Sequence, residues 1–151
     1  MLEVELIRNT NLDRDFIFKL STDIENFSKL LPKYFKSLTI LESKNSEFLV
    51  EEKITFMGRS IVVKTKHVVR KPNFHSIQIL NGLLKNSYFS ELYEPSVSGT
   101  RITIDVKLKF NGISKFLFLF SFLIKNQINK VMDEFILACE TQKNSSKNSL
   151  H

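Results

Sequence analysis

The feature that most constrains this chain of 151 residues is an apolar segment near its C-terminus, from Ile113 to Gln142. Its apolar residues recur at spacings of three and four, which is the period of an α-helix. One stripe of the predicted helix, at about 100° per residue, contains Ile113, Leu117, Phe120, Ile124, Ile128, Val131, Phe135 and Ala138. We therefore expect one long helix that buries this stripe, so the preceding residues must supply the surface that it packs on.

The N-terminal third predicts a strand followed by two short helices. Residues 1–8 alternate apolar and polar side chains with period two, which is typical of a half-buried strand. Asn11 or Asp13 can cap the first helix, and Asp23 can cap the second, which ends before Pro32.

No helical period survives between residues 34 and 110, where short turns separate five or six predicted strands. Consecutive strands joined by short turns must be antiparallel. In the last strand one face is apolar and the other polar, with Ile102, Ile104, Val106, Leu108 and Phe110 on the apolar face. This α+β pattern predicts a sheet whose apolar face is covered by the C-terminal helix.

Length and composition predict one domain, residues 1–142, and a disordered tail, residues 143–151, which is rich in Asn, Ser and Lys. The net charge of +6 favours polyanions as partners. Basic residues alternate with apolar ones on the predicted strands, however, which indicates solvated faces and makes nucleic acid an unexpected partner. The single Cys139 excludes an internal disulfide. With no signal peptide in the sequence, we expect a cytoplasmic protein, with contact at a membrane surface left open.

Several short motifs resemble those of the START-like superfamily, which includes polyketide cyclase/dehydrase proteins, coenzyme Q-binding proteins and lipid-transfer domains. The motifs are Asp23-Ile24-Glu25-Asn26-Phe27 before Leu31-Pro32, then Asn81-Gly82-Leu83-Leu84-Lys85, Tyr93-Glu94-Pro95 and Gly99-Thr100-Arg101-Ile102-Thr103. The resemblance covers Met1 to Gln142. It implies the helix-grip fold, in which a curved antiparallel sheet of six or seven strands, with two short helices after the first, wraps around one long C-terminal helix.

A hairpin centred on Gly58 and Arg59 places three polar side chains, Glu52, Thr65 and His67, on the predicted inner face. In this register Glu52 pairs with Thr65, and His67 is its diagonal neighbour. A carboxylate in an apolar interior must be paired, protonated or wet. Two structural explanations are possible: Glu52 and His67 hydrogen-bond each other, or a bulge turns Glu52 to solvent. Two functional ones are also possible: the pair contacts the polar end of a ligand, or it acts on a ligand as an acid/base pair.

The strand from Lys85 to Tyr93 can present either of two sets inward: Tyr88, Ser90 and Leu92, or Phe89, Glu91 and Tyr93. We take the first set and count Tyr88 among the expected ligand contacts. His75 lies beside the Pro72 turn and is expected to be exposed. Because the three histidines are far apart and no second cysteine is present, we predict neither a metal site nor a cofactor.

The leading hypothesis is a protein that binds a hydrophobic small molecule, such as a lipid, an isoprenoid or quinone, or a polycyclic compound, between sheet and helix. Its expected wall positions are Phe48, Val50, Ile54, Phe56, Val63, Ile104, Val106, Phe120, Ile124 and Ile128. A second hypothesis is a cyclase or dehydrase that uses Glu52 or His67 for proton transfer.

A third hypothesis concerns two aromatic residues outside the helical stripe. Phe118 and Phe122 lie beside Lys115 and Lys125 on the other side of the predicted helix. A loop can cover these rings, a second subunit can bury them in a homodimer, or they can touch an anionic membrane. Membrane contact of this kind can serve the exchange of ligand. The third hypothesis itself is an assembly or membrane-docking module with a filled interior and no ligand, which acts through Phe118 and Phe122.

Overall fold

The computed structural model describes residues 1–112 and 120–149. Within these residues, one antiparallel sheet of seven strands has the order β1-β7-β6-β5-β4-β3-β2. The strands are β1 (Leu2–Thr10), β2 (Phe35–Lys44), β3 (Glu47–Phe56), β4 (Arg59–Arg70), β5 (Phe74–Ile79), β6 (Tyr88–Ser96) and β7 (Gly99–Leu108). Strands β2 to β7 form the meander expected from the short turns. β1 extends the sheet by pairing with β7 and forms one of its edges.

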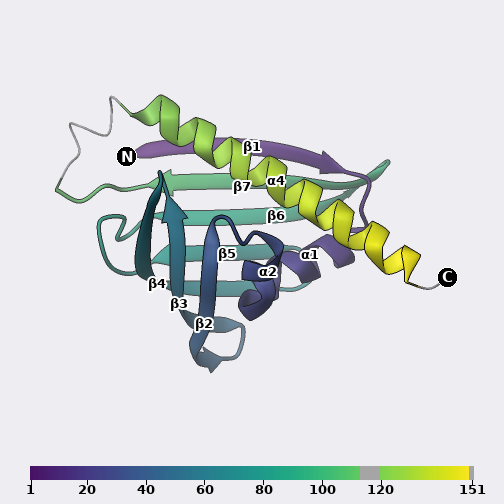
Figure 1. Cartoon of the computed structure of the whole chain (residues 1–151), viewed down its shortest axis with the longest axis horizontal. Helices are drawn as coiled ribbons and strands as arrows, with labels where there is room; N and C mark the ends of the chain where they lie inside the picture. The colour runs from purple at the N-terminus through teal and green to yellow at the C-terminus, as the bar shows by residue number, and fades with distance from the viewer. Residues whose placement is uncertain (113–119, 150–151) are drawn as a thin grey trace.

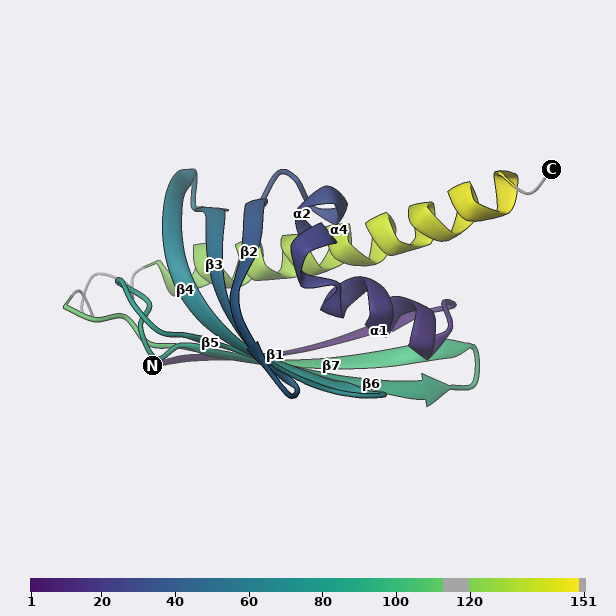
Figure 2. The same cartoon turned by 90° about the horizontal axis from the view of Figure 1, so that it is seen from below.

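Two short helices carry the chain from β1 at one edge of the sheet to β2 at the other. Helix α1 (Arg14–Thr22) begins after Asp13, whose side chain accepts a hydrogen bond from the Asp15 N–H. A 3₁₀ turn, η1 (Ile24–Asn26), and helix α2 (Phe27–Leu30) follow. Figure 2 shows that the sheet curves strongly, and that β2, β3 and β4 rise on the side where all the helices lie.

The long helix α4 (Ser121–Asn148) crosses the concave face of the sheet diagonally (Figure 1). Polar contacts attach it to β1, where the Arg8 guanidinium donates to Asp133 at 2.8 Å and to Asn129 at 2.7 Å. The side chains of α4 that are most deeply buried are Ile124, Phe135 and Cys139. Ile124 and Phe135 belong to the predicted apolar stripe, which therefore faces the core.

The prediction for this helix needs correction at Phe120 and at its C-terminal end. Ile113, Leu117, Phe118 and Lys115 lie outside the described residues. Phe120, expected to face inward, precedes the first turn of α4, and 45% of its surface is exposed. At the other end α4 continues to Asn148, so residues 143–148, predicted as part of a disordered tail, are helical. One reason is that the Lys143 ammonium lies 4.8 Å from the Phe16 ring of α1, a cation–π contact that holds this turn against the domain.

The β3–β4 hairpin also differs from its prediction. Its turn consists of Met57 and Gly58, both with positive φ (51° and 78°), and Phe56 pairs with Arg59. The predicted turn, Gly58 and Arg59, lies one residue later, and the structure instead places Met57 in the left-handed region that non-glycine residues rarely adopt. The pairing therefore differs by two residues, and Glu52 faces Val63 rather than Thr65. Since a shift of two preserves the side-chain alternation, the same residues still face inward.

The main core lies between α1, α4 and strands β1, β6 and β7. Ile102, Ile104, Val106 and Leu108 alternate inward along β7 and are almost fully buried, as predicted. At the start of that strand, a Cβ on Gly99 would lie 2.2 Å from the Thr10 carbonyl oxygen, so only glycine allows this approach to the end of β1.

Candidate functional site

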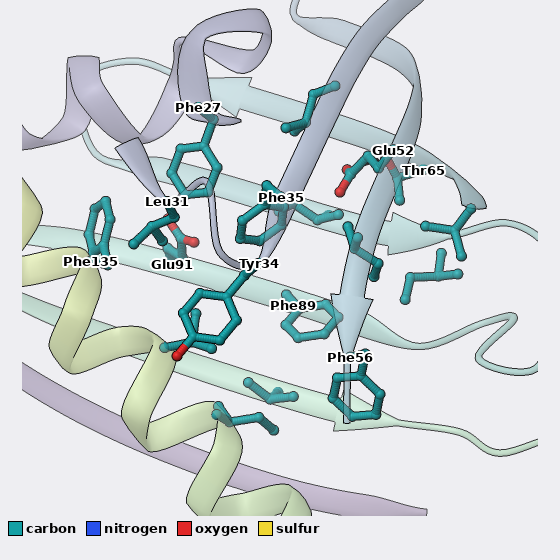
Figure 3. A pocket seen from close by; sticks show the side chains of 18 of the residues that line it. Phe27, Leu31, Tyr34, Phe35, Glu52, Phe56, Thr65, Phe89, Glu91 and Phe135 are labelled. Atoms are coloured by element: carbon teal, nitrogen blue, oxygen red, sulfur yellow. Dashed lines mark hydrogen bonds between the residues drawn. The ribbon is translucent and has the colours of Figure 1, made fainter. Parts of the chain in front are cut away.

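A cavity of about 190 Å³ lies between the concave face of the sheet and the helices α2 and α4. Figure 3 shows side chains from both sides converging on it. The sheet contributes Leu38, Glu52, Ile54, Thr55, Phe56, Val63, Thr65, His67, His75, Ile77, Ile79, Phe89, Glu91, Ile104, Val106 and Leu108. The helices and the segment around them contribute Ser21, Ile24, Phe27, Leu31, Tyr34, Phe35, Gln127, Ile128, Val131, Met132 and Phe135, and Leu84 completes the lining. The domain therefore encloses an apolar space instead of filling it.

The helical wall, as we call the lining residues of α2, α4 and the segment 31–35, is held by aromatic and aliphatic packing. The Phe27 ring meets Phe35 edge-on with centroids 5.0 Å apart, and lies 6.1 Å from the Phe135 ring of α4. The buried Tyr34 hydroxyl has no hydrogen-bond partner within residues 1–112 and 120–149. Burial, with a smaller effect of Glu134, raises the pKa of Tyr34 to about 12.

The sheet side carries a group of buried polar side chains that begins at Glu52. The Thr65 hydroxyl donates to Glu52 Oε1 at 2.6 Å, and His67 Nε2 lies 2.7 Å from the same oxygen. All three side chains are less than a tenth exposed. The sequence-based expectation that Glu52 and His67 lie within reach of each other is confirmed, and no bulge turns Glu52 to solvent.

The group continues across the next two strands. His67 Nδ1 lies 3.0 Å from His75 Nε2, and His75 Nδ1 lies 3.6 Å from Glu91 Oε2. The Tyr93 hydroxyl donates to that carboxylate oxygen at 2.6 Å. We call this series of six side chains (Thr65, Glu52, His67, His75, Glu91 and Tyr93) the polar chain. It runs from β3 to β6 along the sheet and joins two carboxyl groups through two imidazole rings.

The charge state of Glu91 follows from its neighbours. Burial opposes ionisation of this carboxyl group, but the nearby His75 imidazole, helped by the Tyr93 hydroxyl and His67, outweighs it and holds the pKa of Glu91 below its ordinary value. Burial and the Glu91 charge together raise the pKa of Tyr93 well above its usual value, so its hydroxyl stays a donor.

The predicted wall positions divide into two sets. The cavity is lined by Ile54, Phe56, Val63, Ile104, Val106 and Ile128, together with the predicted polar residues Glu52, Thr65 and His67. Phe48 and Val50 do not line the cavity. They pack in a neighbouring cluster with Leu38 and Ile24, which do line it. Ile124 is buried in the main core, and Phe120 is exposed. Any role of the lining residues in binding stays a prediction.

Two expectations about the polar groups were wrong. Strand β6 turns Phe89 and Glu91 toward the cavity, so Tyr88, the expected contact, faces away from it. His75, expected to be exposed beside its turn, is 3% exposed. The pairing of Glu91 with both His75 and Ile104 explains both errors, because neighbours on adjacent strands share a face. The sequence left both faces of this strand open, and Glu91 belongs to the set that was not taken.

The expected docking residues are only partly described. Phe122 is 70% exposed and Lys125 is exposed on the same end of α4, whereas Phe118 and Lys115 lie outside the described residues. No helix in residues 1–112 or 120–149 is long and apolar enough to cross a membrane. Contact of Phe122 with a membrane or a second subunit stays a prediction.

Metal and thiol chemistry find no support in the described ranges. There, no group of three or more His, Cys, Asp or Glu side chains has a geometry that would hold a metal ion. Cys139 is fully buried, and its burial raises the pKa of the thiol to about 12, which keeps it protonated. Cys139 is therefore a small buried hydrophobic residue, as its position near the helical stripe predicts.

Comparison with solved structures identifies the architecture. The structure of TTHA0849 from Thermus thermophilus has a TM-score of 0.78 and 14% sequence identity, over 93% of this chain and 98% of that chain. A START superfamily protein from Mycobacterium smegmatis has a TM-score of 0.72 and 15% identity, over 94% and 97% of the two chains. The chain has the START-like, helix-grip fold.

A third similar structure is the Zhui aromatase/cyclase from Streptomyces sp. R1128, with a TM-score of 0.73 and 11% identity over 95% of this chain and 94% of that chain. No family model and no curated protein sequence matches this chain. At these identities the comparisons establish the START-like fold, while function must be argued from the cavity itself.

Proposed function

We propose that this protein binds a hydrophobic small molecule in the cavity between its sheet and α4. The observation that carries the proposal is an apolar cavity of about 190 Å³. The chain has 14 phenylalanines, whose rings have enough volume to fill such a space, yet the cavity is open. An engineered apolar cavity of roughly 150 Å³ binds benzene. The space therefore suits a compact body of one or two fused rings, or an isoprenoid segment.

The driving force would be removal of apolar surface from water, which is favourable by about 25 cal/mol per Å² before the costs of association. The helical wall and the aliphatic sheet residues supply that surface on both sides of the ligand. The names of two structural neighbours, a START superfamily protein and an aromatase/cyclase, support a small-molecule ligand at the level of the fold.

Two experiments test this proposal. Mass spectrometry of an organic extract of the purified protein is expected to detect a retained hydrophobic molecule. Naphthalene, titrated into delipidated protein and followed by its fluorescence, is expected to bind at one saturable site. Val63→Phe, which adds a ring to the cavity lining, should abolish this binding.

Val62→Phe is the matched control, because Val62 is the neighbouring residue on β4 and faces solvent. It should leave naphthalene binding unchanged. Equal binding by both variants would contradict a ligand in this cavity.

The enzyme alternative has one specific observation in its favour: a carboxyl group and an imidazole in contact at 2.7 Å on the cavity wall. Such a pair can move a proton on a bound polyketide-like substrate, with Glu52 or His67 as the base. A linear poly-β-ketone incubated with the protein would then yield a cyclised product detectable by liquid chromatography and mass spectrometry. Loss of that product in Glu52→Gln with retained substrate binding would establish catalysis, and unchanged turnover in Glu52→Gln would exclude this mechanism.

A further inference from the structure

The described residues that line the cavity include no Lys or Arg side chain, although the chain as a whole is basic. The sequence has 22 Lys and Arg residues, and none of them is among the described residues that line the space. The titratable side chains that do line it are Tyr34, Glu52, His67, His75 and Glu91. Any positive charge available to a ligand must therefore come from the two imidazole rings.

The contact between those rings limits their charge. A distance of 3.0 Å between His67 Nδ1 and His75 Nε2 leaves room for a single proton, because two N–H groups would point at each other. The two rings therefore hold at most three protons and carry a charge of at most +1. With Glu91 ionised, the polar chain cannot have a net positive charge, whatever the state of Glu52.

Three protons can be distributed over the polar chain in two arrangements, and in both the His75 Nδ1–H faces Glu91 Oε2 at 3.6 Å without a hydrogen bond. In the first, His67 Nε2–H donates to ionised Glu52, His75 Nε2–H donates to His67 Nδ1, and His75 Nδ1–H points at Glu91. In the second, the Glu52 carboxyl donates to His67 Nε2, His67 Nδ1–H donates to His75 Nε2, and His75 Nδ1–H again points at Glu91. The two differ only by the shift of two protons along the chain, and the net charge is −1 in both.

Glu52 is a member of the polar chain that is placed to meet a ligand. Its Oε1 atom is occupied by Thr65 and His67, whereas Oε2 has no hydrogen-bond partner in the described part of the chain. Figure 3 shows the Glu52 and Thr65 side chains on the sheet side of the cavity, across from the aromatic rings of the helical wall. Oε2 would thus offer a ligand a hydrogen-bond acceptor in both arrangements, as a carboxylate oxygen in the first and as the carbonyl oxygen of a carboxylic acid in the second.

We propose that the cavity selects ligands whose apolar body carries an uncharged hydroxyl group, a phenol or an alcohol, bound at Glu52, and that it rejects carboxylates of the same shape. A hydroxyl group can donate to Oε2, so it matches either proton arrangement. A carboxylate would be buried beside a chain of net negative charge, and no Lys or Arg among the described lining residues would receive it. This inference rests on the proposed function, because it concerns the ligand of the same cavity.

The test compares three probes with one body: naphthalene, 2-naphthol and 2-naphthoate, titrated into the full chain at pH 7. We expect 2-naphthol to bind about tenfold or more tightly than naphthalene, as one hydrogen bond to a charged group provides. We expect 2-naphthoate to bind more weakly than naphthalene. Binding of 2-naphthoate as tight as that of 2-naphthol would overturn the inference while leaving the cavity a binding site. Failure of all three probes would overturn the proposed function itself.

A pair of variants locates the selectivity. In Glu52→Gln the negative charge is lost, and the preference for 2-naphthol over 2-naphthoate should fall by about tenfold or more. Glu51→Gln removes the same charge from the neighbouring residue of β3, which lies outside the cavity lining, and should leave the preference unchanged. An unchanged preference in Glu52→Gln would overturn the assignment of Glu52. If that variant does not fold, the three-probe comparison on the natural chain decides the matter.

Discussion

The two sides of the cavity are built from different interactions. On the sheet side, the polar chain joins side chains of four neighbouring strands through contacts of 2.6 to 3.6 Å. On the other side, the helical wall consists of rings and aliphatic chains that touch only by packing, such as Phe27 against Phe35 and Phe135. On the sheet side the polar contacts have fixed directions, because backbone hydrogen bonds between the strands set the positions of the side chains. On the helical side the packing contacts have no preferred direction and can adapt.

This difference indicates a division of labour in recognition. Strand pairing sets the positions of Glu52, His67 and Glu91, so a ligand's polar group has one place to bind. α2 has a single turn and α4 has its polar anchors at β1, so the helical wall can adjust to different apolar bodies. We therefore expect variants of the sheet side to be costly and variants of the helical wall to be mild.

The largest expected effect comes from removing the centre of the polar chain. His67→Leu leaves the buried Glu52 carboxyl and His75 without their shared partner, and breaking such a pair costs about 3 kcal/mol or more of unfolding free energy. Urea denaturation measures this loss. Lys66→Leu is the control, because its ion pair with Glu47 is exposed and contributes at most about 1 kcal/mol. Equal losses in the two variants would show that the polar chain does not stabilise the sheet.

A smaller, pH-dependent effect is expected at the other end of the polar chain. Because its neighbours lower the pKa of Glu91 in the folded state, this group stabilises the fold above the pKa of the unfolded chain, and the contribution is lost as the pH falls through the folded pKa. Glu91→Gln should therefore lower the unfolding free energy by about 1–2 kcal/mol at pH 7. The difference from the natural chain should shrink below pH 4.5, the ordinary pKa. A difference that is independent of pH would contradict the ionised state of Glu91.

The smallest effect is expected on the helical wall. Met132→Leu conserves volume in the α4 lining and should cost less than about 1.5 kcal/mol, because such exchanges are tolerated in apolar surroundings. The affinity for naphthalene should change by less than about tenfold, as a fluorescence titration can determine. A loss as large as that of His67→Leu would mean that the two sides are equally rigid.

Much of the fold was predictable, because it depends on periodicity. The alternation in β7, the Asp13 cap of α1 and the apolar stripe of the long helix all correspond to elements of the structure. The inward direction of Glu52, Thr65 and His67 was also predictable, even with the wrong turn, because the error in register was an even number of residues. Alternation is a local property, so a single chain reveals it.

The other half of the polar chain was not predictable for a physical reason. Strand β6 offers polar residues on both faces, so its direction depends on pairing with β5 and β7, which no local pattern specifies. A buried Glu91 is tolerated only because His75 and Tyr93 reach it from places that become adjacent in the folded sheet. Burial of His75 follows from the same pairing.

The sequence by itself determined the order of elements, the single apolar face of the last strand and the amphipathic helix that must cover it. Tertiary structure decided that this cover is incomplete and that two carboxyl groups and two imidazoles meet beneath it. The reason is that alternation between buried and exposed side chains can be read from neighbouring residues in the sequence. A cavity or a shared proton depends instead on how separate strands and the helix pack in three dimensions.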